Sequence, residues 1–81
     1  MKPYPKLRGA MQERDIRNMD LAALLGRSRS YVSQRMTAKE YFWDIHEIYA
    51  ILAYLEIPLD RVFEYFPPKG GIIEPKRRAD A

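Results

Sequence analysis

Hydrophobic residues recur along the chain at helical spacing, and polar, glycine or proline residues separate the segments that carry them. The first segment carries Leu7, Ala10 and Met11 at this spacing after a proline-rich start. A helix is therefore predicted over residues 6–14. The second segment carries Leu21, Ala22, Leu24 and Leu25. Asn18 can cap the start of this second helix, and Gly26 can end it in the left-handed conformation.

A third helix is predicted over residues 28–37, with Ser28 as its cap. Val32 and Met36 lie four residues apart, so they share one face and are predicted to point inward. Apart from Tyr31, the other faces of this helix carry no bulky apolar side chain. The helix is therefore predicted to present hydrogen-bonding side chains to the solvent.

The next helix has a clearly marked start. Asp44 and Glu47 stand three residues apart and match the capping box, in which each side chain binds the backbone of the other. The apolar positions that follow are Ile45, Ile48, Ile51, Leu52 and Leu55. Their spacing predicts the central, most buried helix of the domain, which breaks at residues 56–58.

A last helix is predicted over residues 59–66, before the prolines and glycines of residues 67–71. Its apolar stripe consists of Leu59, Val62, Phe63 and Phe66. Five helices predict an all-α domain over residues 1–66. Residues 67–81 are predicted to form a tail that is either flexible or supports a dimer.

Composition narrows the class of protein. The chain has 81 residues, enough for one domain with one modest core, and its 47% hydrophobic and 31% charged content is typical of folded proteins. It has no cysteine and one histidine, which excludes a structural zinc site, and no cofactor is expected. The longest apolar run, residues 48–55, is too short to span a bilayer, and the start lacks the apolar stretch of a signal peptide. A cytoplasmic location is therefore expected.

Charge is unevenly distributed. The net charge is +3, and no acidic residue occurs between Asp20 and Glu40. The same window contains the cations Arg27, Arg29, Arg35 and Lys39. This pattern predicts one positive surface that suits nucleic acid, although a solvated face can collect cations by chance.

The second and third helices have the features of a helix-turn-helix unit. Two helices that cross after a short turn need a small residue at their contact, a glycine in the turn and an apolar anchor, which Ala22, Gly26 and Val32 provide. The start of the third helix then projects outward and can enter the major groove of DNA. The residues predicted to meet base edges are Arg29, Ser30, Ser33 and Gln34.

The chain resembles the helix-turn-helix family of lambda-type phage repressors and Cro-like regulators, also called the Xre-like family. The matching residues are Leu21-Ala22, Leu25-Gly26, Ser28-Arg29-Ser30, Val32-Ser33 and Ile57-Pro58-Leu59-Asp60 before Val62-Phe63. The resemblance covers residues 6–66 and implies a five-helix DNA-binding domain, with the position of Asn18 at a phosphate. The chain departs from the family where Ala38 replaces a frequent glycine, and where Arg35 takes a usual apolar position just before Met36.

These residues are expected to divide into two roles. Arg29 is the predicted specificity residue, because its planar guanidinium can bind two acceptors of one guanine. The predicted phosphate contacts are Asn18, Arg27, Tyr31, Arg35 and Lys39. For Tyr31 a second interpretation stays open, a partly buried side chain that braces the turn. The aromatic run Tyr41, Phe42 and Trp43 is interpreted as core rather than as a stacking surface for bases.

A homodimer is expected, because one short helix contacts too few bases for selectivity. Its surface is predicted to include Phe63, Tyr65, Phe66, Ile72 and Ile73, and residues 71–74 are a candidate strand. The basic residues 76–78 are alternatively an arm on phosphates. The predicted function is a small transcriptional regulator, acting as a repressor. The alternative is an antitoxin-like or adaptor module that binds another protein, and no motif indicates an enzyme.

Overall fold

The computed structural model describes residues 2–39 and 41–71, and all regular structure among them is helical. The α-helices are α1 (Pro5–Glu13), α2 (Asn18–Leu25), α3 (Arg29–Arg35), α4 (Ile45–Tyr54) and α5 (Val62–Tyr65). Two 3-10 turns accompany them, η1 (Leu59–Arg61) directly before α5 and η2 (Pro68–Gly71) after it. The predicted all-α fold with five helices is confirmed.

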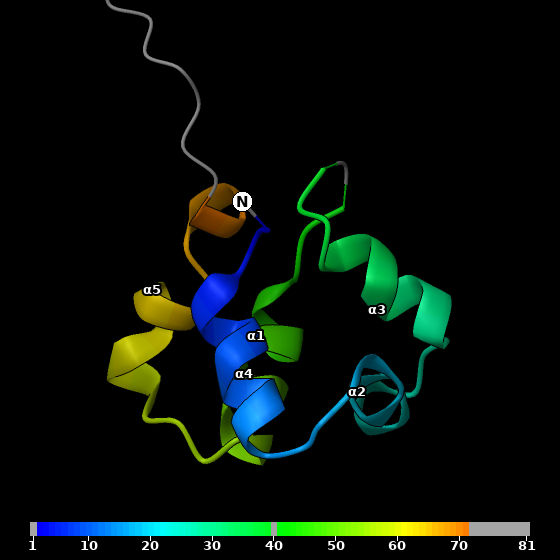
Figure 1. Cartoon of the computed structure of the whole chain (residues 1–81), viewed down its shortest axis with the longest axis horizontal. Coiled ribbons are helices and arrows are strands. Elements are labelled where there is room, and N and C mark those ends of the chain that lie inside the picture. Colours follow the sequence, from blue (N-terminus) through cyan, green and yellow to red (C-terminus); the bar gives the residue numbers. More distant parts are fainter. Residues whose placement is uncertain (1, 40, 72–81) are drawn as a thin grey trace, which may run out of the picture.

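The core lies around α1 and α4. These two helices occupy the middle of the molecule, with α2 and α3 on one side and α5 and η2 on the other (Figure 1). The largest fully buried side chains are Leu7, Leu21, Val32, Met36, Ile51, Leu52 and Leu55. Three of them belong to the central helix or its last turn, as its periodicity predicted. Each of the first four α-helices thus contributes at least one fully buried residue to a single core.

The first turn of α4 differs from its predicted orientation. Ile45 was predicted to be buried, but its side chain is 49% exposed. Glu47, two residues further along, is buried instead. Residues two apart point to opposite sides of a helix, so turning Glu47 inward turns Ile45 outward.

The last predicted helix begins as a 3-10 turn, and two residues of its predicted apolar stripe are exposed. Leu59 and Phe63 are 54% and 75% exposed, whereas Tyr65 and Phe66 are buried. A 3-10 turn has three residues per turn instead of 3.6. Because η1 forms the first part of this segment, positions that would align on a continuous α-helix do not align here.

Two of the three predicted N-terminal caps are confirmed. Asp44 and Glu47 form the reciprocal capping box, with N···O distances of 2.9 and 3.0 Å. Ser28 caps α3. Asn18 is not a cap: it is the first residue of α2, and Arg17 precedes it as the cap. The carboxylate of Asp20 accepts the Arg17 N–H at 2.8 Å and so takes the capping role from within the helix.

The aromatic run before α4 is only partly core. Trp43 is buried and meets Phe66 edge to face, with ring centroids 6.1 Å apart. Tyr41 and Phe42 are 46% and 47% exposed, so their predicted burial is wrong. The three residues lie outside any helix, so helical spacing does not decide which of their side chains point inward.

Residues 67–71, the first part of the predicted tail, pack against the start of the chain. Tyr4 donates its backbone N–H to the carbonyl of Gly70 at 2.7 Å. Gly70 is buried, and a methyl group there would lie 2.8 Å from the Cβ atoms of Pro3 and Ala38. Ala38 itself has φ 56°, the left-handed conformation that glycine adopts most easily. The remaining tail, with Ile72, Ile73 and the basic residues 76–78, lies outside the described residues.

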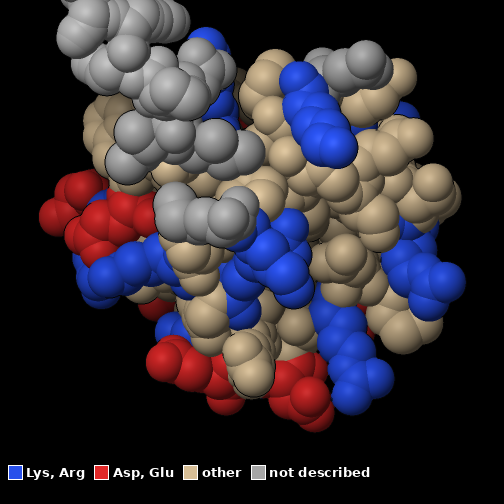
Figure 2. Space-filling model, turned by 45° about the horizontal axis from the view of Figure 1, so that its top comes forward, with Lys and Arg blue, Asp and Glu red and all other residues tan. Residues whose placement is uncertain are grey.

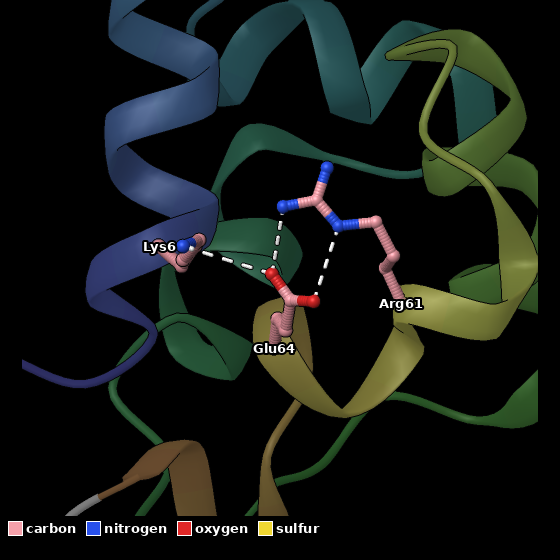
Figure 3. A network of polar contacts seen from close by, with 3 residues as sticks. All are labelled: Lys6, Arg61 and Glu64. Carbon is pink, nitrogen blue, oxygen red and sulfur yellow. Dashed lines mark hydrogen bonds and ion pairs between the residues drawn. The ribbon is translucent and has the colours of Figure 1, made fainter.

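A surface network joins α1 to the η1–α5 segment (Figure 3). The guanidinium of Arg61 donates to both carboxylate oxygens of Glu64, at 3.1 and 2.8 Å, and Lys6 Nζ lies 3.6 Å from the same carboxylate. The hydrogen bond from Arg61 is the main cause that lowers the pKa of Glu64 below its ordinary value. All three groups face solvent, where such pairs contribute little to stability.

Alanine substitutions at two glycines with nearly the same backbone conformation can test the packing of η2. Gly26 and Gly70 have φ of 68° and 69°, but a Cβ at Gly26 meets no atom within 4 Å. We expect Gly26→Ala to lower the free energy of unfolding by about 1 kcal/mol, the conformational cost alone. Gly70→Ala should lower it by about 2 to 4 kcal/mol, because the clash adds to that cost. Denaturant unfolding measures both values, and equal losses would contradict the packing of η2 against Pro3 and Ala38.

Candidate nucleic-acid interface

Helices α2 and α3 are joined by a turn of Gly26, Arg27 and Ser28. The left-handed conformation of Gly26 lets the next N–H, that of Arg27, reach back to the carbonyl of Ala22 at 2.9 Å. Ser28 Oγ then accepts the N–H of Tyr31 at 3.0 Å and begins α3. Two local hydrogen bonds therefore fix where the first helix ends and where the second begins.

The inner sides of α2 and α3 pack into the core. Leu21 and Val32 are fully buried, and Ala22 is 5% exposed. The burial of Ala22, a small residue, fits its predicted place at the contact of the two helices. Met36, at the end of α3, is 2% exposed. Val32 and Met36 are thus the inward residues of α3, and they fix which side of this helix faces solvent.

The four predicted base-contacting residues all lie exposed on α3. They are Arg29, Ser30, Ser33 and Gln34. Within the described part of the chain, the side chains of Arg29, Ser30 and Gln34 form no hydrogen bond. The structure therefore brings together, on a helix of seven residues, the groups that the sequence assigned to one surface.

Asn18 lies beside this surface. Its side-chain Nδ2 donates to Ser33 Oγ at 3.4 Å, which connects the start of α2 to the middle of α3. Asn18 is half-buried and Ser33 is exposed. The hydrogen bond places the predicted phosphate-contacting amide next to one of the predicted base-contacting hydroxyls.

Three of the cations in the acid-free window are exposed. They are Arg27, Arg29 and Lys39. Figure 2 shows lysine and arginine side chains over the middle and right of one face and a further group at its left beside acidic side chains, while other acidic side chains lie along the lower margin. The right side of this view corresponds to α2 and α3 in Figure 1. The helix-turn-helix side of the molecule is therefore positive.

Glu47 of α4 is the one charged residue that is buried among those described, with 7% exposure. Its Oε1 accepts the backbone N–H of Asp44 at 3.0 Å and lies 3.7 Å from Arg35 Nε. Its Oε2 accepts the hydroxyl of Tyr31. One carboxylate therefore caps α4 and binds two side chains of α3.

Arg35 and Tyr31 face α4 rather than the exposed side of α3. The guanidinium of Arg35 lies 3.5 Å from the ring centroid of Tyr31, and its side chain is 17% exposed. The guanidinium of Arg27 lies 4.7 Å from the same ring. Tyr31 is half-buried, and its hydroxyl donates to Glu47 of α4.

Sequence reasoning missed two residues that hold α3 in place. Glu47 was recognised only as half of a capping box, because its contacts with α3 cannot be read from local spacing. Arg8 of α1 donates to the carbonyl of Met36 at 2.8 Å and to that of Pro3 at 2.6 Å. Arg8 and Met36 are 28 residues apart, so no local pattern signals their contact.

The described surface offers hydrogen-bonding groups and positive charge. Among the residues that the structure describes, no histidine, aspartate and glutamate side chains are grouped as metal ligands would be. No helix in this part of the chain has the length and apolar content needed to cross a bilayer. Comparison with protein-family models, curated proteins and solved structures gave no match for this chain. The assignment of function therefore rests on the chemistry of this surface.

Removing the hydroxyl of Tyr31 tests its contact with Glu47. The hydrogen bond to Glu47, followed by burial, raises the pKa of Tyr31 above its ordinary value of 10.0. For a raised pKa, the stabilisation is complete below the unfolded-state pKa and is lost as the pH rises through the folded-state pKa. We expect Tyr31→Phe to lower the free energy of unfolding at pH 7 by about 1 to 3 kcal/mol.

The deficit of Tyr31→Phe should shrink above pH 10.0, where the parent protein begins to lose this contribution. Denaturant unfolding between neutral and alkaline pH measures the difference between the two proteins. Tyr49→Phe is the control, because Tyr49 is 48% exposed and should show no deficit at any pH. A Tyr31→Phe deficit that stays constant across this range would contradict the contact.

Proposed function

We propose that this protein is a small transcriptional regulator, acting as a repressor, that binds double-stranded DNA sequence-specifically with α3 in the major groove. One observation carries the proposal. The inner side of α3 is held in the core by Val32 and Met36, while its exposed side carries Arg29, Ser30, Ser33 and Gln34. A major groove about 12 Å wide admits one α-helix, whose polar side chains can then read base edges.

Arg29 is the proposed specificity residue. It is the first residue of α3, it is exposed, and its side chain forms no hydrogen bond to the described part of the chain. Its guanidinium can therefore donate to N7 and O6 of a guanine without breaking an internal contact. Ser33, held by Asn18, offers a hydroxyl whose position is already restricted.

The proposed phosphate contacts flank α3. Arg27 precedes the helix, Lys39 follows it, and both are exposed. Cations in such places gain from phosphate without needing groove geometry. Arg35 and Tyr31 were also predicted at phosphates, but Glu47 binds both. We propose that these two side chains position α3 instead.

Membership in the lambda-repressor and Cro-like family is part of this proposal. It is supported by the short turn between α2 and α3, by the left-handed Gly26 and by a further helical segment after the Ile57-Pro58 break. Reading two half-sites requires a homodimer. The proposal involves no catalysis, no cofactor and a cytoplasmic location.

A second function is favoured by exposed aromatic rings. The side chains of Phe42 and Phe63 are 47% and 75% exposed. Exposed apolar surface can mark a site where another protein binds. In this alternative the protein is an antitoxin-like or adaptor module that binds another protein chain, and DNA binding is secondary.

Selection of bound sequences from a random duplex pool, followed by titration at two salt concentrations, separates the two functions. The regulator predicts a palindromic site with half-sites about 10 base pairs apart. Weak binding to all sequences that high salt abolishes would instead indicate a non-specific basic surface and favour the protein-binding module.

Two substitutions test the division between base and phosphate contacts. Arg29→Ala should relax the preference at one base pair by about 1 to 3 kcal/mol, because a bidentate contact is lost. Lys39→Ala should weaken binding to all sequences alike and reduce the salt slope by about 1. Lys6→Ala is the control, since Lys6 lies on α1 next to Glu64 and should leave binding unchanged. Binding titrations on matched and mismatched duplexes measure these effects, and equal losses on every sequence from both substitutions would refute the division.

A further inference from the structure

An apolar cavity of about 350 Å³ lies between three segments that are far apart in the sequence. Its wall is formed by Tyr4 before α1, by the loop before α4 together with one residue of α4, and by residues 66–69. The described wall consists of four aromatic side chains, one isoleucine, two prolines and one lysine. Clefts of this size, with mostly apolar walls and few polar groups, are typical of sites for small molecules.

Trp43 in this wall carries a buried hydrogen-bond donor. The residue is 8% exposed, and its indole Nε1 finds no acceptor in the described part of the chain and is closed to solvent. A buried donor without an acceptor is costly, and the N–H of a buried tryptophan usually has one. An acceptor that a ligand brings into the cavity removes this cost. Phe42, the preceding wall residue, is 47% exposed, so its ring can change rotamer as a ligand enters.

Charge at the cavity selects the kind of acceptor. Lys69 is exposed and is the one charged residue of the described wall, which holds no acidic side chain. Its positive charge favours an anionic acceptor and repels a cationic ligand. An ionised carboxylate has only acceptor oxygens, and hydrogen bonds to it are stronger than those to neutral oxygens. The rest of the wall requires the body of the ligand to be apolar.

We propose that this cavity binds a small carboxylic acid with an apolar body. The ionised carboxylate accepts the N–H of Trp43 and lies next to Lys69. The apolar body packs against the rings of Tyr4, Phe42 and Phe66. The ring centroids of Tyr4 and Trp43 lie 6.0 and 6.1 Å from that of Phe66, so these three rings already form one continuous apolar surface.

The site is separate from the surface proposed to meet DNA. None of the residues proposed to contact bases or phosphates belongs to the described wall of the cavity. The inference therefore does not rest on DNA binding, and its test uses the full chain without DNA. Failure of this test and failure of DNA binding are separate results.

Trp43 is the only tryptophan of the chain, so its fluorescence reports on the cavity directly. Octanoate and 1-octanol at pH 7 are the probes, because they share the same carbon chain and only octanoate is charged. Octanoate is expected to change the emission of Trp43 with a dissociation constant of about 0.1 to 1 mM. 1-Octanol is expected to bind at least about fivefold more weakly. A merely apolar cavity gives the opposite order, because an ionised carboxylate loses more than a hydroxyl on leaving water.

Two matched pairs of variants test the wall. Lys69→Gln is expected to weaken octanoate by about twofold to fivefold and to leave 1-octanol unchanged. Lys6→Gln, which changes an exposed cation of α1 outside the wall, should alter neither probe. Phe42→Ala is expected to weaken both probes by about threefold to tenfold, because apolar contact is lost. Phe63→Ala, at a ring that is 75% exposed and outside the wall, should alter neither.

Trp43→Phe removes the donor and keeps an aromatic ring. Calorimetry replaces fluorescence for this variant, and its affinity for octanoate is expected to fall about tenfold or more, with less than about a twofold change for 1-octanol. Circular dichroism verifies that each variant is folded. If Trp43→Phe does not fold, Lys69→Gln and Phe42→Ala decide, because both side chains are exposed.

Two results overturn the proposal. One is a parent protein that binds octanoate no better than 1-octanol, or does not bind it at all up to about 10 mM. The other is octanoate binding that stays the same in Lys69→Gln and Phe42→Ala, which places the probe elsewhere on the protein.

Discussion

The arrangement of α3 and α4 depends on the contacts of one buried carboxylate, that of Glu47. A charge in the interior is costly unless it is paired and hydrogen-bonded. Glu47 meets this requirement through the backbone of Asp44 and the side chains of Tyr31 and Arg35. The start of α4 and the orientation of α3 are therefore coupled, because losing either set of contacts leaves the buried carboxylate with only some of its partners.

This coupling divides the positive charges of the helix-turn-helix side into two groups. Arg35 is held against Tyr31 and Glu47, and Arg8 binds the carbonyl that ends α3, so both arginines stabilise the position of the helix. Arg29 and Lys39 remain exposed on and beside it. The same inward turn of Glu47 removes charge from the outer side of α4. The orientation of α3 and the absence of an acidic side chain from the outer side of α4 are thus two consequences of one buried group.

Local patterns in the sequence were sufficient wherever the physical cause is local. The capping box at Asp44, the cap at Ser28 and the left-handed Gly26 each involve atoms within a few residues, and all three were predicted correctly. Asn18 shows the limit of this reasoning. Several nearby side chains can satisfy the same backbone donor, and the carboxylate of Asp20 did so instead. The exposed residues of α3 were predictable because Val32 and Met36 fix its inner side.

The sequence by itself determined the number of helices, their order and the polar side of α3, since helical periodicity and capping act over one or two turns. Only the tertiary structure decided which apolar residues are used in the core. Ile45 and Phe63 are exposed and Trp43 and Tyr65 are buried, because burial depends on which segments pack together and not on hydrophobicity alone. The contacts of Glu47 with α3 and of Gly70 with Tyr4 join residues far apart in the chain. Such contacts form only when the whole fold brings their atoms together, so no local pattern contains them.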